Sequence, residues 1–188
     1  TEKYSAKDIA QIVDRVGGQH NAATNREYTC YYINVVSDYL EMSLDILSDM
    51  YYNSTFDPVE IGKEKNVVVE EIRMYEDTPD EFIHDFFMEK MLQGHPLSHS
   101  ILGSVEGIES ISRESLMNFY DEYYVNDNAI LAIAGSFDPE KAKSLIESYF
   151  AVKRKTAKPA SVIEINTPVR SLIEHVEKDL EQVHFNMG

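Results

Sequence analysis

The residues best suited to chemistry are the glutamates of segment 57–77, which holds five of them among Val, Ile, Met and Tyr residues. The Asp-Pro pair at its start predicts the beginning of a helix, because Asp caps helices well and Pro is tolerated in the first turn. At about 100° per residue, Glu64 and Glu71 fall inside the broad apolar arc of this helix. They lie about two turns apart and nearly above one another, whereas Glu70 falls on the polar side.

Glu64 and Glu71 need partners if the apolar arc is buried. A buried carboxylate without a cation, a metal or several hydrogen-bond donors costs free energy. One interpretation is that Lys or Arg residues elsewhere pair with them, or that the helix rotates and leaves them at a solvated margin. The other is that they belong to a metal site. Periodicity alone leaves both open.

Other candidate ligands and nucleophiles are weaker. His95 and His99 have a spacing that would hold a metal on a helix, but Pro96 and Gly94 favour a loop. The remaining histidines are scattered without ligand spacing. Cys30 lies within a strand pattern, where a free cysteine behaves as a small apolar residue.

The elements that must position these residues alternate between helices and hairpin-like strands. Ser5, Ser112 and Asp138 are good helix N-caps. The pattern predicts helices over 5–16, 37–52, 57–77, 79–92, 113–124 and 138–150, a short helix after 104, a hairpin of strands 20–24 and 28–36, and strands over 128–136, 169–176 and 182–187. This order indicates an α+β fold, with helices packed on a mostly antiparallel sheet that is expected to be incomplete.

Composition limits the function classes. The 188 residues are 43% apolar, enough for a substantial core, and 33 Asp and Glu against 17 Lys and Arg give a formal charge of −16. That charge disfavours nucleic acid and anionic membranes and favours cationic partners such as basic peptides. No apolar run is long enough to span a membrane, and a single cysteine is typical of a reducing compartment, so we expect a cytoplasmic protein.

The helix sequence Glu-Lys-Asn-Val-Val-Val-Glu-Glu-Ile at 64–72 resembles a metal-binding helix of the M16 zinc metallopeptidases, the insulinase and mitochondrial processing peptidase family. In these enzymes a His-x-x-Glu-His helix gives two zinc ligands and a general base, and a glutamate on a later helix gives the third ligand. The resemblance implies that Glu71 binds Zn²⁺ and that Glu64 supports the site from the second shell of residues. It also implies the LuxS/MPP-like metallopeptidase fold.

Segment 17–29 is similar to the first strand pair of the same family, in which an Asn-Ala-x-Thr strand is an exposed edge that pairs with the substrate backbone. The resemblance therefore implies that Asn21, Ala22 and Ala23 bind substrate. Segments 95–104 and 120–128 are also similar to family segments. The His-x-x-Glu-His motif occurs nowhere in the chain. In the family it lies shortly before the segment resembling Thr1 to Ser5, so we expect an internal fragment truncated just downstream of it.

The resemblance implies an M16 peptidase N-terminal domain over 1–150, truncated before Thr1, a linker at 151–160, and the start of the following segment or second-domain strands at 161–188. It implies a zinc-dependent endopeptidase that cleaves extended peptides or unfolded proteins by metal-activated water, with the fragment alone inactive. A second M16 domain in the same chain and a homodimer are the assemblies that it suggests. The alternative is a non-catalytic homologue that acts as a partner or scaffold subunit, or as a peptide-binding module.

Overall fold

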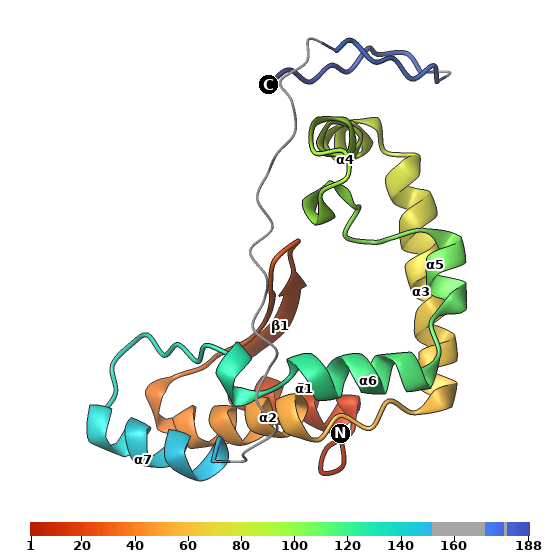
Figure 1. The fold of residues 1–188 in the computed structure, drawn as a ribbon. Coiled ribbons are helices and arrows are strands. Elements are labelled where there is room, and N and C mark those ends of the chain that lie inside the picture. Colours follow the sequence, from red (N-terminus) through yellow and green to blue (C-terminus); the bar gives the residue numbers. More distant parts are fainter. Residues whose placement is uncertain (152–171, 179) are drawn as a thin grey trace. The chain divides into compact units, whose positions relative to one another are not determined.

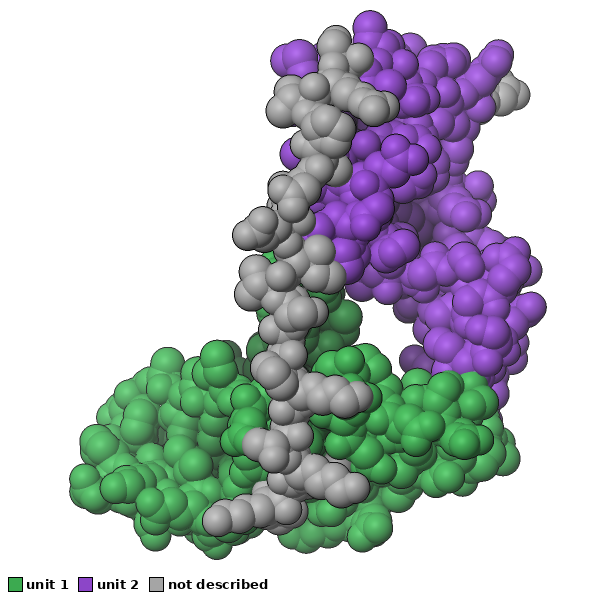
Figure 2. All heavy atoms as spheres, in the orientation of Figure 1, with its two compact units in different colours: residues 1–60, 112–159 green, residues 61–111, 160–188 purple. Residues whose placement is uncertain are grey.

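The computed structural model describes residues 1–151, 172–178 and 180–188. The chain divides into two compact units that interleave in sequence, as Figure 2 shows. The first comprises residues 1–60 and 112–159, and the second comprises residues 61–111 and 160–188. Each unit is considered by itself.

The first unit combines helices with a two-stranded hairpin (Figure 1). Its elements are α1 (Ala6–Arg15), β1 (Gln19–Thr24), β2 (Thr29–Asn34), the 3₁₀ turn η1 (Ser37–Tyr39), α2 (Leu40–Tyr52), α6 (Arg113–Tyr123), the 3₁₀ turn η3 (Asn126–Asn128) and α7 (Pro139–Tyr149). The long helix α3 (Pro58–Glu76) begins in the last residues of segment 1–60, which belongs to the first unit, and continues into the second unit. The second unit adds α4 (Pro79–Met91), the 3₁₀ turn η2 (Pro96–Ser98) and α5 (Val105–Ser110).

The predicted helix caps are confirmed in the first unit. The Ser5 hydroxyl accepts a hydrogen bond from the backbone N–H of Asp8, whose carboxylate accepts one from the backbone N–H of Ser5 in return, which makes a capping box. Ser112 makes the corresponding pair with Ser115 at the start of α6. At α7, the Asp138 carboxylate caps the helix that Pro139 opens. Local side-chain chemistry therefore sets these boundaries, as the sequence predicts.

The hairpin packs on α1 and α2 through β2. Ile33 of β2 contacts a core cluster that consists of Ile9, Val13 and Ile46. Gly18 makes the close approach of α1 and the hairpin possible, because a Cβ there would lie 2.6 Å from Val35 Cγ1 and 2.9 Å from Val13 Cγ1. The two strands are antiparallel, with Ala22 opposite Tyr31. The predicted hairpin is thus confirmed, and the core holds it from one side.

The strands predicted over 128–136 and 182–187 are wrong. Within the described residues, the sheet contains only β1 and β2. Ile130 has 96% of its surface exposed and Val183 has 93%, so neither run is packed as a buried strand would be. A strand requires a hydrogen-bonded neighbour, and these runs have none in the described part of the chain. Residues 172–176 are not a strand either, while 169–171 and most of the predicted linker lie outside the described residues.

Candidate functional site

Helix α3 presents a narrower buried face than the sequence predicts. Its buried or half-buried residues form the stripe Ile61, Lys65, Val68, Val69, Ile72 and Tyr75, which follows helical spacing. The Lys65 ammonium reaches across to donate to the carbonyl oxygen of Glu109, 2.9 Å away, at the end of α5.

Glu64 and Glu71 lie beside this stripe and are exposed, so both fall outside the face of α3 that is buried in this structure. The helix is rotated enough to put both on one flank. Val67 and Met74 share that flank, and 50% and 66% of their surfaces are exposed. The four residues follow an i, i+3, i+7, i+10 pattern, so carboxylates and apolar side chains alternate along one exposed line of α3.

Glu70 has a different environment from Glu71. At about 100° per residue it lies on the face opposite the buried stripe. Its carboxylate pairs with the Arg73 guanidinium at 2.5 Å, one turn further along the helix. The two adjacent glutamates therefore lie on different sides of α3, both exposed, with Glu70 in an ion pair with Arg73.

The described residues do not assemble a zinc site on their own. No group of three or more His, Cys, Asp or Glu side chains in residues 1–151, 172–178 and 180–188 is placed to hold a metal ion. Glu64 and Glu71 are separated by about 10 Å of helix rise, which is too far for adjacent ligands of one tetrahedral ion. The carboxylate of Glu71 is a suitable zinc donor, but it fits one position of a four-coordinate shell.

His95 and His99 do not form a metal pair either. His95 is buried, and its Nδ1 accepts a hydrogen bond from the backbone N–H of Leu97 at 3.2 Å, which caps η2. His99 is exposed at the end of the same turn. The proline and glycine signals thus predict this loop correctly, and the two imidazoles are not held at helical spacing.

Strand β1 is an open edge in the described part of the structure. All six of its residues are exposed, and β2 is its sheet partner. The Asn21 Oδ1 accepts a hydrogen bond from the backbone N–H of Ala22 at 2.8 Å, and Asn25 N–H donates to Tyr28 O at 2.8 Å in the hairpin turn. In an antiparallel pair, alternate residues of a strand point their backbone N–H and C=O groups toward the partner strand. Both hydrogen bonds therefore indicate that residues 21 and 23 point these groups toward β2, whereas Ala22 points its N–H and C=O outward.

Asp45 and Asp49, one turn apart on α2, make contacts that the sequence patterns do not predict. Asp45 accepts from the Lys3 ammonium at 2.6 Å and from the Tyr4 hydroxyl at 2.7 Å, and the hydrogen bond to Asp45 raises the pKa of Lys3 above its usual range. Asp49, only 4% exposed, accepts from the hydroxyl of Thr1. Acidic residues on an otherwise buried helix face were the available signal. Together they hold segment 1–4 against α2.

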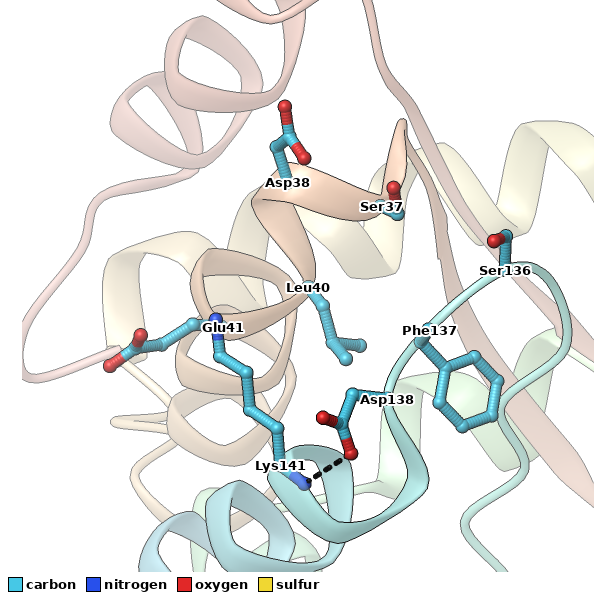
Figure 3. Close-up of a pocket in the computed structure, with 8 residues that line it drawn as sticks. All are labelled: Ser37, Asp38, Leu40, Glu41, Ser136, Phe137, Asp138 and Lys141. Atoms are coloured by element: carbon cyan, nitrogen blue, oxygen red, sulfur yellow. Dashed lines mark hydrogen bonds between the residues drawn. The ribbon is translucent and has the colours of Figure 1, made fainter.

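A cavity of about 200 Å³ lies in the first unit between the N-terminal ends of α2 and α7 (Figure 3). Its lining residues are Ser37, Asp38, Leu40, Glu41, Ser136, Phe137, Asp138 and Lys141. The Asp138 carboxylate is engaged in capping α7 and accepts from the backbone N–H of Lys141 at 3.2 Å, the contact drawn as a dashed line. None of the predicted site residues lines this cavity.

Sequence comparison identifies the family. Residues 1–105 match the model of the insulinase family, peptidase family M16, and residues 110–188 match the model of the peptidase M16 inactive domain. The chain belongs to the M16 peptidase family. Its fold class is the predicted one, α+β with helices and a small antiparallel sheet.

Curated relatives are longer proteins. The zinc protease YmxG of Bacillus subtilis is 38% identical over 188 residues, which is 100% of this chain and 45% of that protein. A zinc protease of Mycobacterium leprae is 32% identical over 100% of this chain and 43% of its own length. Both are named as uncharacterised zinc proteases. The chain therefore spans less than half the length of these relatives.

Solved structures agree with the fold. A protease from Helicobacter pylori matches with a TM-score of 0.80 and 25% identity, covering 90% of this chain and 40% of that one. An M16-like peptidase from Alicyclobacillus acidocaldarius matches with a TM-score of 0.73 and 28% identity, covering 88% of this chain and 38% of that one.

No helix in the described part of the chain is both long and apolar enough to cross a membrane.

Proposed function

We propose that this chain is part of a zinc-dependent endopeptidase that cleaves extended peptides, and that Glu71 supplies one zinc ligand. Zinc, when bound, would polarise the peptide carbonyl and activate water. The roles of this chain are to present one carboxylate from α3, to support it through Glu64, and to bind the substrate backbone along β1. This chain by itself is expected not to cleave peptides, because one carboxylate leaves most of the zinc shell unfilled.

One observation carries this proposal: Glu64 and Glu71 share an exposed flank of α3 with two exposed apolar residues. Val67 and Met74 have half or more of their surfaces in solvent. Apolar side chains interleaved with carboxylates along one line are typical of a surface that another segment covers. A covering segment that brings the remaining ligands would desolvate the apolar residues and place a cation beside the carboxylates.

The substrate backbone would bind at β1 by strand addition. The outward N–H of Ala22 donates a hydrogen bond to Asn21 Oδ1 at 2.8 Å. The carbonyl oxygen of a bound peptide can take the place of this side-chain acceptor. The small side chains at positions 22 and 23 leave room beside the edge. Main-chain pairing reads an extended conformation more than particular side chains, which suits unfolded or extended peptides. Asn21 and Ala23 contribute by pairing with β2, opposite Tyr32 and Cys30, which holds the edge strand in place.

Basic substrates fit the second unit best. A hollow of about 120 Å³ at the junction of α3 and α4 is lined by Glu76, Phe82, Asp85 and Glu89 among others. A lysine of this chain already contacts its rim: the Lys178 ammonium lies 4.3 Å from the centre of the Phe82 ring and donates to the carbonyl oxygen of Glu76. A cation over an aromatic face beside carboxylates is favourable, so a Lys or Arg of a substrate can bind in the same way.

The test compares three glutamate-to-glutamine changes in a full-length protein that carries this chain. Glu71→Gln should sharply reduce zinc affinity and nearly abolish cleavage, because a neutral amide is a poor zinc ligand. Glu64→Gln should lose about 10- to 100-fold in affinity or activity, as changes behind a ligand commonly do. Metal content by atomic emission and turnover of a quenched peptide give the two readings.

Glu70→Gln is the matched control, since it changes the adjacent carboxylate and breaks only the ion pair with Arg73. It should leave zinc content and turnover near their original values. Zinc loss in Glu70→Gln with Glu71→Gln intact would refute the assignment. Full zinc content in all three variants, together with no turnover in the unmodified protein, would favour the non-catalytic partner or scaffold subunit instead.

A further inference from the structure

The side chains that attach the hairpin to the first unit come from β2. All residues of β1 are exposed, so β1 buries no side chain of its own. Directly opposed residues of an antiparallel pair share a face, and alternate residues of one strand do too. Tyr31 and Ile33 therefore point to the same side of β2, and Ile33 packs on the core cluster of α1 and α2. Tyr31 is the second attachment on that face.

The Tyr31 hydroxyl meets the hydroxyl of Tyr124, 93 residues away in sequence, at 3.1 Å. Tyr31 is half-buried, and burial, followed by the hydrogen bond with Tyr124, raises the pKa of Tyr31 above its usual range. The phenol thus stays protonated at neutral and moderately alkaline pH. Two phenol hydroxyls can share one hydrogen bond with either oxygen as donor.

Tyr124 is itself fixed at the end of α6. Its ring lies 5.4 Å from the ring of Tyr51 and 5.0 Å from that of Tyr120, measured between centroids. The Tyr120 hydroxyl donates to the carbonyl oxygen of Tyr51 at 2.7 Å, and the Tyr51 hydroxyl donates to that of Val125 at 3.1 Å. Aromatic packing and two backbone hydrogen bonds therefore tie α2 to α6 around Tyr124.

We infer that the Tyr31–Tyr124 hydroxyl pair is a positioning contact, which holds the hairpin in place for strand addition at the β1 edge. Tyr31 lies directly across from Ala22, the residue whose backbone faces outward. A two-stranded hairpin is marginally stable by itself, so an edge that loses this attachment must be ordered again when a peptide binds. This inference rests on the proposed substrate edge. The inference assigns both tyrosines a role through the hairpin and not through contact with the peptide.

The test measures binding of a fluorescent extended peptide to this chain by anisotropy. Tyr31→Phe and Tyr124→Phe should each weaken binding about five-fold, the change expected when one net hydrogen bond is lost. The double variant should bind like either single variant, because both changes remove the same contact. Tyr32→Phe is the matched control. Tyr32 is the next residue of β2, lies on the opposite face and is exposed, so its change should have less than a two-fold effect.

Hydrogen exchange without peptide tests positioning separately from binding. Amides of residues 19–34 should exchange faster in Tyr31→Phe and in Tyr124→Phe, while those of α1 and α2 keep their protection. Faster exchange throughout the unit would show a general structural role and overturn the inference. Additive effects of the two changes on peptide affinity, or unchanged hairpin exchange in both, would overturn it as well.

The substrate edge and the positioning contact fail in different ways. Ala22→Pro removes the outward donor of the edge itself. If Ala22→Pro binds peptide as the unmodified chain does, the proposed edge is wrong. If Ala22→Pro weakens binding while Tyr31→Phe and Tyr124→Phe do not, the edge stands and the positioning contact is refuted.

Discussion

Proline substitutions at two adjacent positions distinguish the outward side of β1 from the side that faces β2. At Ala22 the N–H points outward and bonds to the Asn21 side chain. Proline there removes one donor from the free edge and leaves the ladder with β2 intact, a position that edge strands tolerate. At Ala23, opposite Cys30, the alternation directs the N–H toward β2, so proline removes a ladder hydrogen bond.

The expected magnitudes follow from one hydrogen bond in each case. Ala22→Pro should weaken peptide binding by about 1 kcal/mol, about five-fold, and change the free energy of unfolding by less than about 0.5 kcal/mol. Ala23→Pro should instead lower the free energy of unfolding by about 1–3 kcal/mol, because the Cys30 carbonyl loses its donor and the ring crowds the pair. Peptide binding would then fall only through loss of the hairpin.

Two measurements separate these outcomes. Urea unfolding followed by circular dichroism gives the stability of each variant, and peptide anisotropy gives its affinity. In a full-length protein, Ala22→Pro should raise KM while zinc content stays intact. The reasoning fails if the pattern is reversed, with Ala22→Pro unfolding the hairpin and Ala23→Pro affecting only peptide affinity. Unchanged values for both variants would remove the β1 edge from the mechanism.

Three further outcomes are expected. Asp49→Ala should lower the free energy of unfolding by about 2–3 kcal/mol in urea titrations, since it leaves the Thr1 hydroxyl and the Asn53 amide, 2.9 Å from the carboxylate, without their charged acceptor; a change under 0.5 kcal/mol would contradict this. The hydrogen bond from the Ser5 hydroxyl lowers the pKa of the Asp8 carboxyl. The ionised carboxylate in the capping box therefore stabilises α1 at pH values above the usual Asp pKa, and this stabilisation is lost as the pH falls through the lowered pKa of Asp8. The thermal unfolding temperature of Asp8→Asn should lack this pH dependence. Replacing lysine by norleucine in a test peptide should weaken its binding, and equal affinities would argue against a basic preference.

The sequence predicts the helices well because their signals are local. Ser5, Ser112 and Asp138 cap helices that begin within a residue of the predicted starts. The hairpin was also predictable, from a β-branched and aromatic run beside a short polar turn. The runs at 128–136 and 182–187 are different. Their composition suits a strand, but a strand forms only with a hydrogen-bonded partner, and the partner's position is not encoded in the run itself.

The candidate site shows the same division between local and non-local information. Helical periodicity places Glu70 and Glu71 on different sides of α3, because adjacent residues differ by about 100°. It misplaces the boundary of the buried face, since Val67 and Met74 count as apolar in any sequence pattern although they are exposed here. Asp45 and Asp49 were missed for the opposite reason. Lys3 and Thr1 lie more than 40 residues before them in the sequence, so no spacing rule could connect these pairs.

The open edge of β1 raises a physical difficulty, because unpaired strand edges promote aggregation unless they are protected. This edge carries no lysine and no proline. Instead, the strand is only six residues long, and the Asn21 side chain occupies the outward N–H of Ala22. A side-chain amide oxygen satisfies that donor as a peptide carbonyl would, yet it can rotate away at little cost. In the proposed binding at β1, a peptide that forms several hydrogen bonds at once would displace the Asn21 side chain, whereas a single weak contact would not.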